Sequence, residues 1–282
     1  MKYLSSCIHF DNRGWLLLSD EKTDEWLEEF SFVMGLTVCN REHSHKIILY
    51  RDDGRIQRTD DILLKCGETG VILPVKGWNV RRIYSSYFLT HPDSNISIFH
   101  YGYGTGDRYA KMMFLLVPVF DYIISAGGLP IHGALIKKEG SGFILAGKST
   151  SGKSTCCSRL NLPWEVMCDD LTLIVKDGEG FYPAHPLPTW SRVREKQSGS
   201  SWNTAEYVPL KKLFFLEKSE KDEVIPVNSR ESAMKIFYLS LQVYTLEGMK
   251  KEEIIQKKQT LFESAWDMAV KIPCYRLRVS AG

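Results

Sequence analysis

The segment from Gly147 to Ser154 constrains the fold more than any other part of this sequence. It runs Gly-Lys-Ser-Thr-Ser-Gly-Lys-Ser and matches the pattern Gly-x-x-x-x-Gly-Lys-Ser/Thr. An apolar stretch over 143–146 precedes it, and a helix is expected over 153–160. A strand, a glycine-bounded loop and a helix in this order predict a phosphate-binding Walker A loop. The alternative is a serine-rich turn that happens to match, and the flanking strand and helix argue against it.

The residue types in this loop suit a nucleotide with its metal ion. Gly147 and Gly152 let the backbone wrap so that successive N–H groups point at phosphate oxygens. Lys153 is expected to hold the β- and γ-phosphates, and the Ser154 hydroxyl is expected to ligate the bridging Mg²⁺. We therefore predict ATP and Mg²⁺ as cofactors. The predicted cofactor-binding residues are Gly147, Lys148, Ser149, Thr150, Ser151, Gly152, Lys153, Ser154 and Thr155.

Two adjacent carboxylates, Asp169 and Asp170, follow a strand-like stretch over 165–168. Neighbouring residues at the end of a strand point to opposite sides, so one carboxylate can face a metal while the other faces an incoming hydroxyl. A pair of carboxylates with these two separate roles is typical of a kinase. A turn or a helix cap is the usual explanation of an isolated Asp-Asp pair. Behind a Walker A loop the functional interpretation is favoured.

Three further side chains are candidates. His132 opens the strand before the loop strand, so its imidazole could stand near the transferred phosphate or the acceptor, although a lone histidine is more often structural. Arg192 and Arg194 follow a rigid segment over 185–191 that contains a tryptophan. They are low-weight candidates for binding phosphate or carboxylate, and solvated surface arginines are the alternative.

The pattern along the chain predicts a mixed α/β (α+β) protein with two parts. Residues 1–105 form an α+β region with a hairpin, in which the strand 47–50 leads into Asp53-Gly54. A helix there begins near Asp20 and ends at Gly35. The glycine-punctuated stretch 101–106 marks the boundary.

Residues 106–282 form the second part. A long helix is expected from Arg108, kinked near Pro118 and closed by Gly127-Gly128. A hairpin of the strands 131–136 and 143–146 follows it. Later helices are expected from Ser229 and over 251–271, and the chain closes with a strand over 275–279.

Composition narrows the function classes. The sequence has 36 Lys+Arg and 34 Asp+Glu, so no strong basic field favours nucleic-acid binding. Apolar runs are too short for a membrane span or a secretory signal, which predicts a cytoplasmic protein. No Cys-x-x-Cys pair stands among the cysteines, so we expect reduced thiols that mostly fill the core, and a zinc site is disfavoured. The seven cysteines are Cys7, Cys39, Cys66, Cys156, Cys157, Cys168 and Cys274.

In the order His132-Gly133, Gly147 to Ser154 and Asp169-Asp170, the sequence resembles HPr kinase/phosphorylase and its relatives, which share the phosphoenolpyruvate-carboxykinase type of P-loop fold. The likeness is close over about 125–175. It extends more weakly to residue 279 through Pro186 to Ser191 and Pro273 to Leu277. Among these relatives the chain is most similar to the SynChlorMet cassette protein ScmC type.

The resemblance implies ATP-dependent phosphorylation of a hydroxyl, with Lys153 and Ser154 on phosphate and Mg²⁺. It implies Asp169 as the base and Asp170 nearer the metal, with the exchange of these two roles left open. The glycine-rich segment with which HPr kinases dock HPr is missing after the core, so HPr as acceptor and the reverse phosphorolysis are doubtful. Self-association into a homo-oligomer is also implied by the resemblance.

The predicted function is transfer of the γ-phosphoryl group of ATP to a serine or threonine hydroxyl, in a peptide or carrier protein of a peptide-modification cassette. Two alternatives stay open. One is a small-molecule kinase, and the other is an ATP-binding sensor that changes its affinity for a cassette enzyme without transferring phosphate. Plain hydrolysis of the nucleotide is a further side reaction. Neither nucleic acid nor a membrane is an expected partner.

Overall fold

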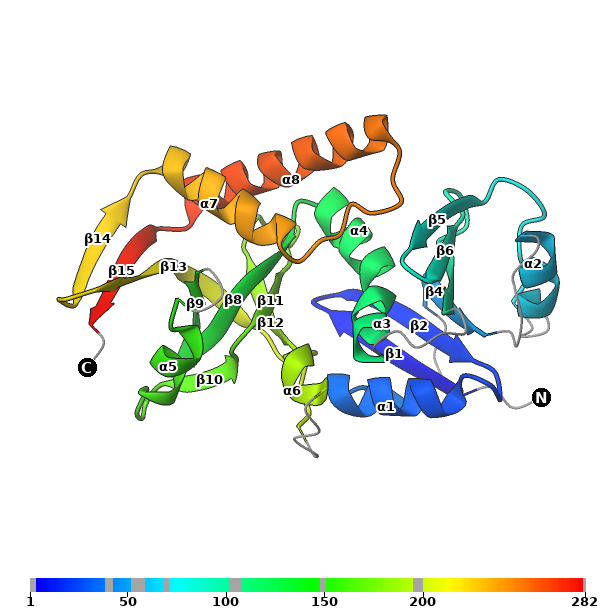
Figure 1. The fold of residues 1–282 in the computed structure, drawn as a ribbon, viewed down its shortest axis with the longest axis horizontal. Helices are drawn as coiled ribbons and strands as arrows, with labels where there is room; N and C mark the ends of the chain where they lie inside the picture. The colour runs from blue at the N-terminus through cyan, green and yellow to red at the C-terminus, as the bar shows by residue number, and fades with distance from the viewer. Residues whose placement is uncertain are drawn as a thin grey trace.

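The fold, seen in a computed structural model, consists of two mixed sheets and their helices (Figure 1). The structure describes residues 4–38, 43–51, 59–67, 71–101, 108–147, 151–194 and 200–280. Within these ranges the chain forms eight helices, so the predicted mixed α/β class is confirmed. The helices are α1 (Asp24–Met34), α2 (Thr59–Gly67), α3 (Arg108–Leu115), α4 (Val117–Ser125), α5 (Lys153–Ser158), α6 (Trp190–Arg194), α7 (Ser229–Leu241) and α8 (Lys251–Lys271).

The N-terminal sheet has the strand order β3-β1-β2-β4-β7-β6-β5. β1 pairs antiparallel with β2 and β3, whereas β4 pairs in parallel with both β2 and β7. α1 lies along β1, and α2 lies at the far end of the sheet (Figure 1). The strands are β1 (Leu4–Phe10), β2 (Arg13–Ser19), β3 (Thr37–Val38), β4 (His45–Tyr50), β5 (Asn79–Ile83), β6 (Ser86–Thr90) and β7 (Ile96–Tyr101).

The parallel pairing of β4 corrects the hairpin predicted after residue 50. β4 is a central strand between two parallel neighbours, and the next described element along the chain is α2. Its four buried residues 47–50 form a continuous apolar run, which is typical of a strand that is covered on both faces. Asp53 and Gly54 lie outside the described residues.

The helix predicted before Gly35 is confirmed as α1. Gly35 ends it with a φ of 62°, a left-handed conformation that glycine adopts without strain. The predicted cap is displaced, because the helix begins after Thr23 and Asp20 lies in the preceding turn. There an Asp20 side-chain oxygen accepts a hydrogen bond of 3.1 Å from the Lys22 backbone N–H.

The single kinked helix predicted from Arg108 is in fact two helices, α3 and α4, which lie between the two sheets (Figure 1). The break falls at Leu116, because Pro118 in the first turn of α4 has no backbone N–H to donate to the preceding turn. Gly127, with a φ of 85°, then turns the chain into the second sheet.

The second sheet contains a closed ring of strands. Its order is β10-β8-β11-β12-β13-β15-β14, and β9 pairs with both β8 and β13, so that β8, β11, β12, β13 and β9 close on one another. The predicted hairpin is confirmed as β8 and β9. The strands are β8 (Leu129–Lys138), β9 (Ser141–Ala146), β10 (Glu165–Cys168), β11 (Leu171–Ile174), β12 (Pro183–Leu187), β13 (Val208–Ser219), β14 (Glu223–Val227) and β15 (Cys274–Ser280).

One apolar core joins the two sheets. It includes Phe10 and Trp15 of the first sheet, Phe120 and Ile124 of α4, and Ile131 of the second sheet, all with at most 2% of their surface exposed. Fully burying a side chain of this size contributes about 1.5–3 kcal/mol to folding. Within the described residues, no helix is long and apolar enough to cross a membrane. The domain boundary at residue 105 remains a prediction.

The prediction that all cysteines are reduced thiols is wrong at Cys7, which is disulfide-bonded. Among the other described cysteines, five are free thiols. Sequence reasoning missed this bond because it considered only closely spaced cysteine pairs. The free cysteines are Cys66, Cys156, Cys157, Cys168 and Cys274.

Candidate functional site

The predicted site lies where β8 is flanked by β9, β10 and β11. β8 carries His132, and the turn between β10 and β11 carries Asp169 and Asp170. The backbone joins them, since the Gly133 N–H donates to the Asp170 carbonyl over 2.8 Å. Position 133 needs glycine because a Cβ there would lie 2.9 Å from a methyl group of Ile144 on β9. The close pairing of β8 with its neighbours therefore brings the histidine-glycine strand to the aspartate turn.

Lys153, the first residue of α5, lies at the centre of this group. Its Nζ donates to the Gly147 carbonyl and contacts His132 Nε2, each over 2.9 Å. Because a lysine ammonium can only donate, Nε2 accepts and the imidazole carries its proton on Nδ1. His132 Nδ1 faces Asp170, with 3.7 Å to its Oδ1. Lysine, histidine and aspartate thus form a continuous polar chain.

Burial and charge set the protonation states in this chain. Burial lowers the pKa of Lys153 from its ordinary value, and the charges of Asp170 and Asp169 oppose that shift. Burial also lowers the pKa of His132, the Lys153 charge adds to the effect, and Asp170 opposes it. A histidine whose pKa lies below its ordinary value is neutral at pH 7. His132 therefore accepts from Lys153 without placing a second positive charge beside it.

Asp169 is buried and held from three sides. Its carboxylate accepts hydrogen bonds from the Thr189 hydroxyl and from Arg192, with which it also forms an ion pair. The Ser154 hydroxyl lies 3.5 Å from its Oδ2. Only 7% of the Asp169 side chain is exposed, against 46% for Arg192. The carboxylate is thus fixed beside the hydroxyl that is expected to ligate Mg²⁺.

Asp170 has the opposite environment. Its side chain is 40% exposed, its Oδ1 lies 3.7 Å from His132 Nδ1, and its charge acts on Lys153. Free carboxylate lone pairs that face solvent can accept a proton from an incoming group. The two adjacent aspartates therefore differ, with one fixed next to Ser154 and the other open. This geometry favours the exchanged assignment, in which Asp169 is nearer the metal and Asp170 is the base.

A cavity of about 730 Å³ adjoins the end of β9. Gly147 and Ser151 form one side of it, and Phe215, Tyr238 and Leu239 supply aromatic and aliphatic surface on the other. Volumes of this order suit cofactor-sized ligands. Gly147 contributes to the shape, because a Cβ there would lie 2.4 Å from Ser151 Oγ. The cavity joins the predicted phosphate loop to an apolar wall formed by β13 and α7.

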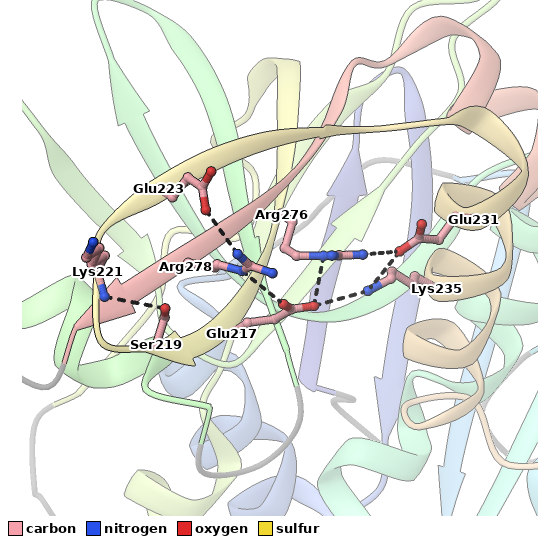
Figure 2. A network of polar contacts seen from close by, with 8 residues as sticks. All are labelled: Glu217, Ser219, Lys221, Glu223, Glu231, Lys235, Arg276 and Arg278. Carbon is pink, nitrogen blue, oxygen red and sulfur yellow. Dashed lines mark hydrogen bonds and ion pairs between the residues drawn. The ribbon is translucent and has the colours of Figure 1, made fainter.

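A network of charged side chains fixes that wall (Figure 2). Arg276 of β15 contacts Glu217 of β13 over 3.0 Å and Glu231 of α7 over 2.9 Å. Lys235 of α7 lies 3.7 Å and 3.4 Å from the same two carboxylates. Arg278 extends the network to Glu223 over 3.0 Å (Figure 2). Three cations meet three carboxylates, so the network ties α7 to the sheet with balanced charge.

A second and larger cavity, about 860 Å³, lies between the two sheets. Tyr84 and Ser86 of the N-terminal sheet line it together with Lys111 of α3 and Tyr244 after α7. Gln242 lines both cavities. None of the described residues that the sequence predicts to bind nucleotide lines this larger cavity.

The structure brings most of the predicted residues to one place. His132, Lys153, Ser154, Asp169 and Asp170 form the connected group described above, with Gly147 and Ser151 at the adjoining cavity. Gly152 precedes α5, and Thr155 lies exposed in its first turn. Arg192 joins the site, whereas Arg194 ends α6 exposed to solvent. Lys148, Ser149 and Thr150 lie outside the described residues.

Sequence reasoning missed Thr189 and the cavity wall. Thr189 lies three residues before Arg192, so a hydroxyl and a guanidinium one helical turn apart were the available signal. The wall residues Phe215 and Tyr238 come from β13 and α7, far along the chain, and only the ring of strands brings them near Gly147.

Comparison with known proteins gives one family match. The model of the family described as SynChlorMet cassette protein ScmC matches residues 106–282, more than half of the chain. The match includes every residue of the connected group and both walls of the cavity beside Gly147. No curated protein matches the chain.

Proposed function

Since the chain belongs to the SynChlorMet cassette protein ScmC family, we propose that this family's region holds a P-loop kinase site that transfers the γ-phosphoryl group of ATP to a hydroxyl. One observation carries the proposal. Lys153 and Ser154 of the Walker A sequence meet the buried Asp169 and the open Asp170 in one polar group. Phosphate binding, a metal ligand and a proton acceptor are the parts that phosphoryl transfer requires.

The nucleotide is proposed to bind across the loop, with its phosphates at Lys153 and its nucleoside in the cavity beside Gly147. Lys153 now donates to Gly147 and His132, and both are weaker partners for an ammonium than phosphate oxygens. Arrival of the phosphates gives the lysine charged acceptors. The Tyr238 ring, which is 56% exposed, offers a surface for a base, whereas Phe215 is 5% exposed and has Lys235 Nζ over its ring.

Mg²⁺ fits the oxygen groups beside the loop. Ser154 Oγ and Asp169 Oδ2, 3.5 Å apart, are ligand types that Mg²⁺ takes together with phosphate oxygens and water. When bound, the ion neutralises charge on the β- and γ-phosphates. Thr189 holds Asp169 through Oδ1, whereas Arg192 pairs with Oδ2 and has to give way when the ion binds there.

Asp170 is proposed to act as the base. The acceptor hydroxyl loses its proton to Asp170 while its oxygen bonds to the γ-phosphorus. The bond from that phosphorus to the β,γ-bridging oxygen breaks, and ADP leaves. His132, neutral with its proton on Nδ1, lies beside the Asp170 carboxylate, with 3.7 Å between Nδ1 and Oδ1. Lys153 stabilises the negative charge that develops on the leaving group.

A serine or threonine hydroxyl of a peptide or carrier protein is the proposed acceptor, which fits the family's description as a cassette protein. A small-molecule hydroxyl is the variant with the same chemistry. The exposed position of Asp170 supports a large acceptor, because its carboxylate faces solvent rather than a closed pocket.

The test is label transfer from γ-labelled ATP with Mg²⁺ into an extract of source cells, with products separated into proteins, peptides and small molecules. We expect Asp170→Asn to bind ATP as tightly as the wild type and to lose transfer. Asp169→Asn is expected to lose both transfer and the tightening of ATP binding by Mg²⁺. Asp93→Asn, on an exposed turn of the N-terminal sheet, is the matched control and keeps full transfer.

The outcomes separate the hypotheses. Label that depends on Asp170 in one fraction supports the kinase and gives the class of its acceptor. Full transfer by Asp170→Asn removes this residue from the base role. ATP binding without labelled product in any fraction favours the sensor hypothesis. That result directs the search to a cassette enzyme that is retained differently with and without nucleotide.

A further inference from the structure

A second group of chemically active side chains lies in the N-terminal sheet, outside the family match. The Sγ atom of Cys7 and ring nitrogens of His9 and His43 all lie within 4.8 Å of one another. Cys7 is buried, His9 is exposed and His43 is half-buried. The proposed kinase chemistry uses none of these residues.

The sheet brings the three side chains together. Cys7 and His9 are two positions apart on β1, so their side chains leave the same face of the strand. β3 pairs antiparallel with β1, with Thr37 opposite Cys7, and this pairing returns the chain to the same edge of the sheet. His43 lies two residues before β4. The group therefore joins the edge of β1 to the start of β4.

The three ligand atoms lie close to the spacing of a coordination site. The His9 and His43 rings meet edge to face at 67°, with centroids 5.0 Å apart. Ligand atoms of a tetrahedral zinc site, with bonds of about 2.0–2.3 Å, lie roughly 3.3–3.8 Å apart. Shifts of about 1 Å in three side chains separate the present arrangement from that geometry.

Glycine at position 14 makes room for both imidazoles. Gly14 lies opposite His9 in the β1–β2 pair. A Cβ at this position would lie 2.5 Å from Nδ1 of His43 and 3.2 Å from Cε1 of His9. Any larger residue would thus displace the rings from their positions beside Cys7.

From this geometry we infer that the reduced chain binds one Zn²⁺ ion through Cys7, His9 and His43. A thiolate with two imidazoles is a donor set that zinc and related borderline metals prefer, whereas Mg²⁺ and Ca²⁺ prefer oxygen donors. Three protein ligands leave a fourth position for water or another donor. The inference does not rest on the proposed kinase activity.

The disulfide at Cys7 sets the condition for binding. A dithiol reductant opens it by giving two electrons and two protons to the two sulfurs, and the dithiol itself becomes a disulfide. Zn²⁺ then displaces the proton of the Cys7 thiol, and both histidines bind in their neutral forms. The disulfide and the metal complex are therefore alternative states of one site.

The hairpin that carries Cys7 and His9 also contacts the second sheet. Phe10, next to His9, packs its ring edge-on against His185 of β12, with centroids 5.1 Å apart. Arg13 of the same hairpin donates to the Lys176 carbonyl over 2.9 Å. A metal that fixes His9 to the start of β4 therefore acts on the hairpin that also contacts the second sheet.

The test uses the full chain, reduced with a phosphine and stripped with a chelator. Titration with Co²⁺ is expected to give the near-ultraviolet charge-transfer band of a thiolate–cobalt bond, saturating at one equivalent. Zn²⁺ should displace Co²⁺ and should raise the melting temperature of the reduced chain. Cys7→Ser is expected to lose the band, and His9→Ala and His43→Ala are expected to weaken binding at least tenfold.

Three controls make the result decisive. His91→Ala, at an intermediate-exposure histidine of the same sheet, should bind as the wild type does. Cys156→Ser, at a free cysteine of α5, should keep the band. If Cys7→Ser does not fold, His9→Ala at the exposed ligand decides the question, with circular dichroism to show that its fold is intact. Absence of the band in the reduced wild type, or tight binding that is indifferent to His9→Ala, overturns the inference.

Discussion

The connected group around Lys153 and the group around Cys7 lie in different sheets and differ in how their residues are assembled. In the first, the loop residues are consecutive, because one stretch of backbone has to wrap a phosphate. In the second, the three side chains are collected by strand pairing across a wide stretch of sequence. A backbone-wrapped ligand leaves a motif in the sequence, whereas a site of convergent side chains leaves scattered residues.

The strongest test of this difference replaces Lys153 with methionine, which keeps the length of the side chain and removes its charge. We expect phosphoryl transfer to fall about 10²–10³-fold, because a charge that stabilises the transition state is lost. Zn²⁺ binding by the reduced chain should not change. Transfer is measured with labelled ATP, and zinc is measured by competition with a chromophoric chelator.

Lys138→Met is the matched control, since this lysine lies over the Trp164 ring and away from the connected group. It should affect neither measurement. If Lys153→Met weakened Zn²⁺ binding as much as transfer, the two groups would not be independent, and the contrast between them would fail.

The next test concerns the junction between the two regions, where buried His185 packs against Phe10. Burial lowers the pKa of His185 from 6.5 to about 4. Between these two pH values the unfolded chain binds more protons than the folded chain. The stability that neutral His185 contributes is therefore fully present above pH 6.5 and is lost as the pH falls to about 4. A shift of this size corresponds to about 3 kcal/mol of unfolding free energy.

His185→Gln should reduce the change in unfolding free energy between these pH values by about that amount, because glutamine does not titrate in this range. The amide also keeps a donor for the Thr204 carbonyl, which His185 Nδ1 contacts over 3.0 Å. Urea unfolding at a series of pH values measures the change, with His91→Gln as the control. An unchanged slope in His185→Gln would show that the acid lability arises elsewhere.

Much of the second sheet could be predicted from local pattern. The β8–β9 hairpin, α5 and α8 follow from alternation and helical spacing within single segments. Prediction failed where non-local pairing decides the outcome. β4 has a hairpin-like sequence but lies between two parallel strands, and Cys7 forms a disulfide with a partner that spacing did not indicate.

For the candidate site, sequence supplied the residue types and structure supplied their arrangement. The spacing of Asp169 and Asp170 indicated that they point to different sides. Which of them faces Ser154 depends on Thr189 and Arg192, which lie just before and within α6 and contact Asp169 only in the folded chain. Likewise, the wall of Phe215 and Tyr238 depends on how the ring of strands closes.

A smaller effect is expected from Gly14→Ala, which tests the group of Cys7, His9 and His43 in the N-terminal sheet. The added Cβ would lie 2.5 Å from His43 Nδ1, so the ring has to move away from Cys7. We expect Zn²⁺ affinity to fall about tenfold, equal to about 1.4 kcal/mol. Gly178→Ala is the control, because a Cβ there meets no atom within 4 Å. Equal affinities in the two variants would show that the imidazoles do not bind the metal in this arrangement.

The smallest effect is expected from Glu217→Gln in the charged network. Arg276 keeps Glu231 over 2.9 Å, and Lys235 keeps the same carboxylate over 3.4 Å, so no cation loses its last described partner. Partly exposed ion pairs contribute about 0–1 kcal/mol, and salt screens them further. The free energy of unfolding, measured with urea, should therefore change by less than about 1 kcal/mol, and the change should be smaller still at high salt. A loss well above that, unaffected by salt, would mean that charge pairing holds α7 on the sheet. A small loss would mean that the apolar core under α7 holds the helix on the sheet. The cavity wall would then keep its shape when a nucleotide binds to the charged side chains around it.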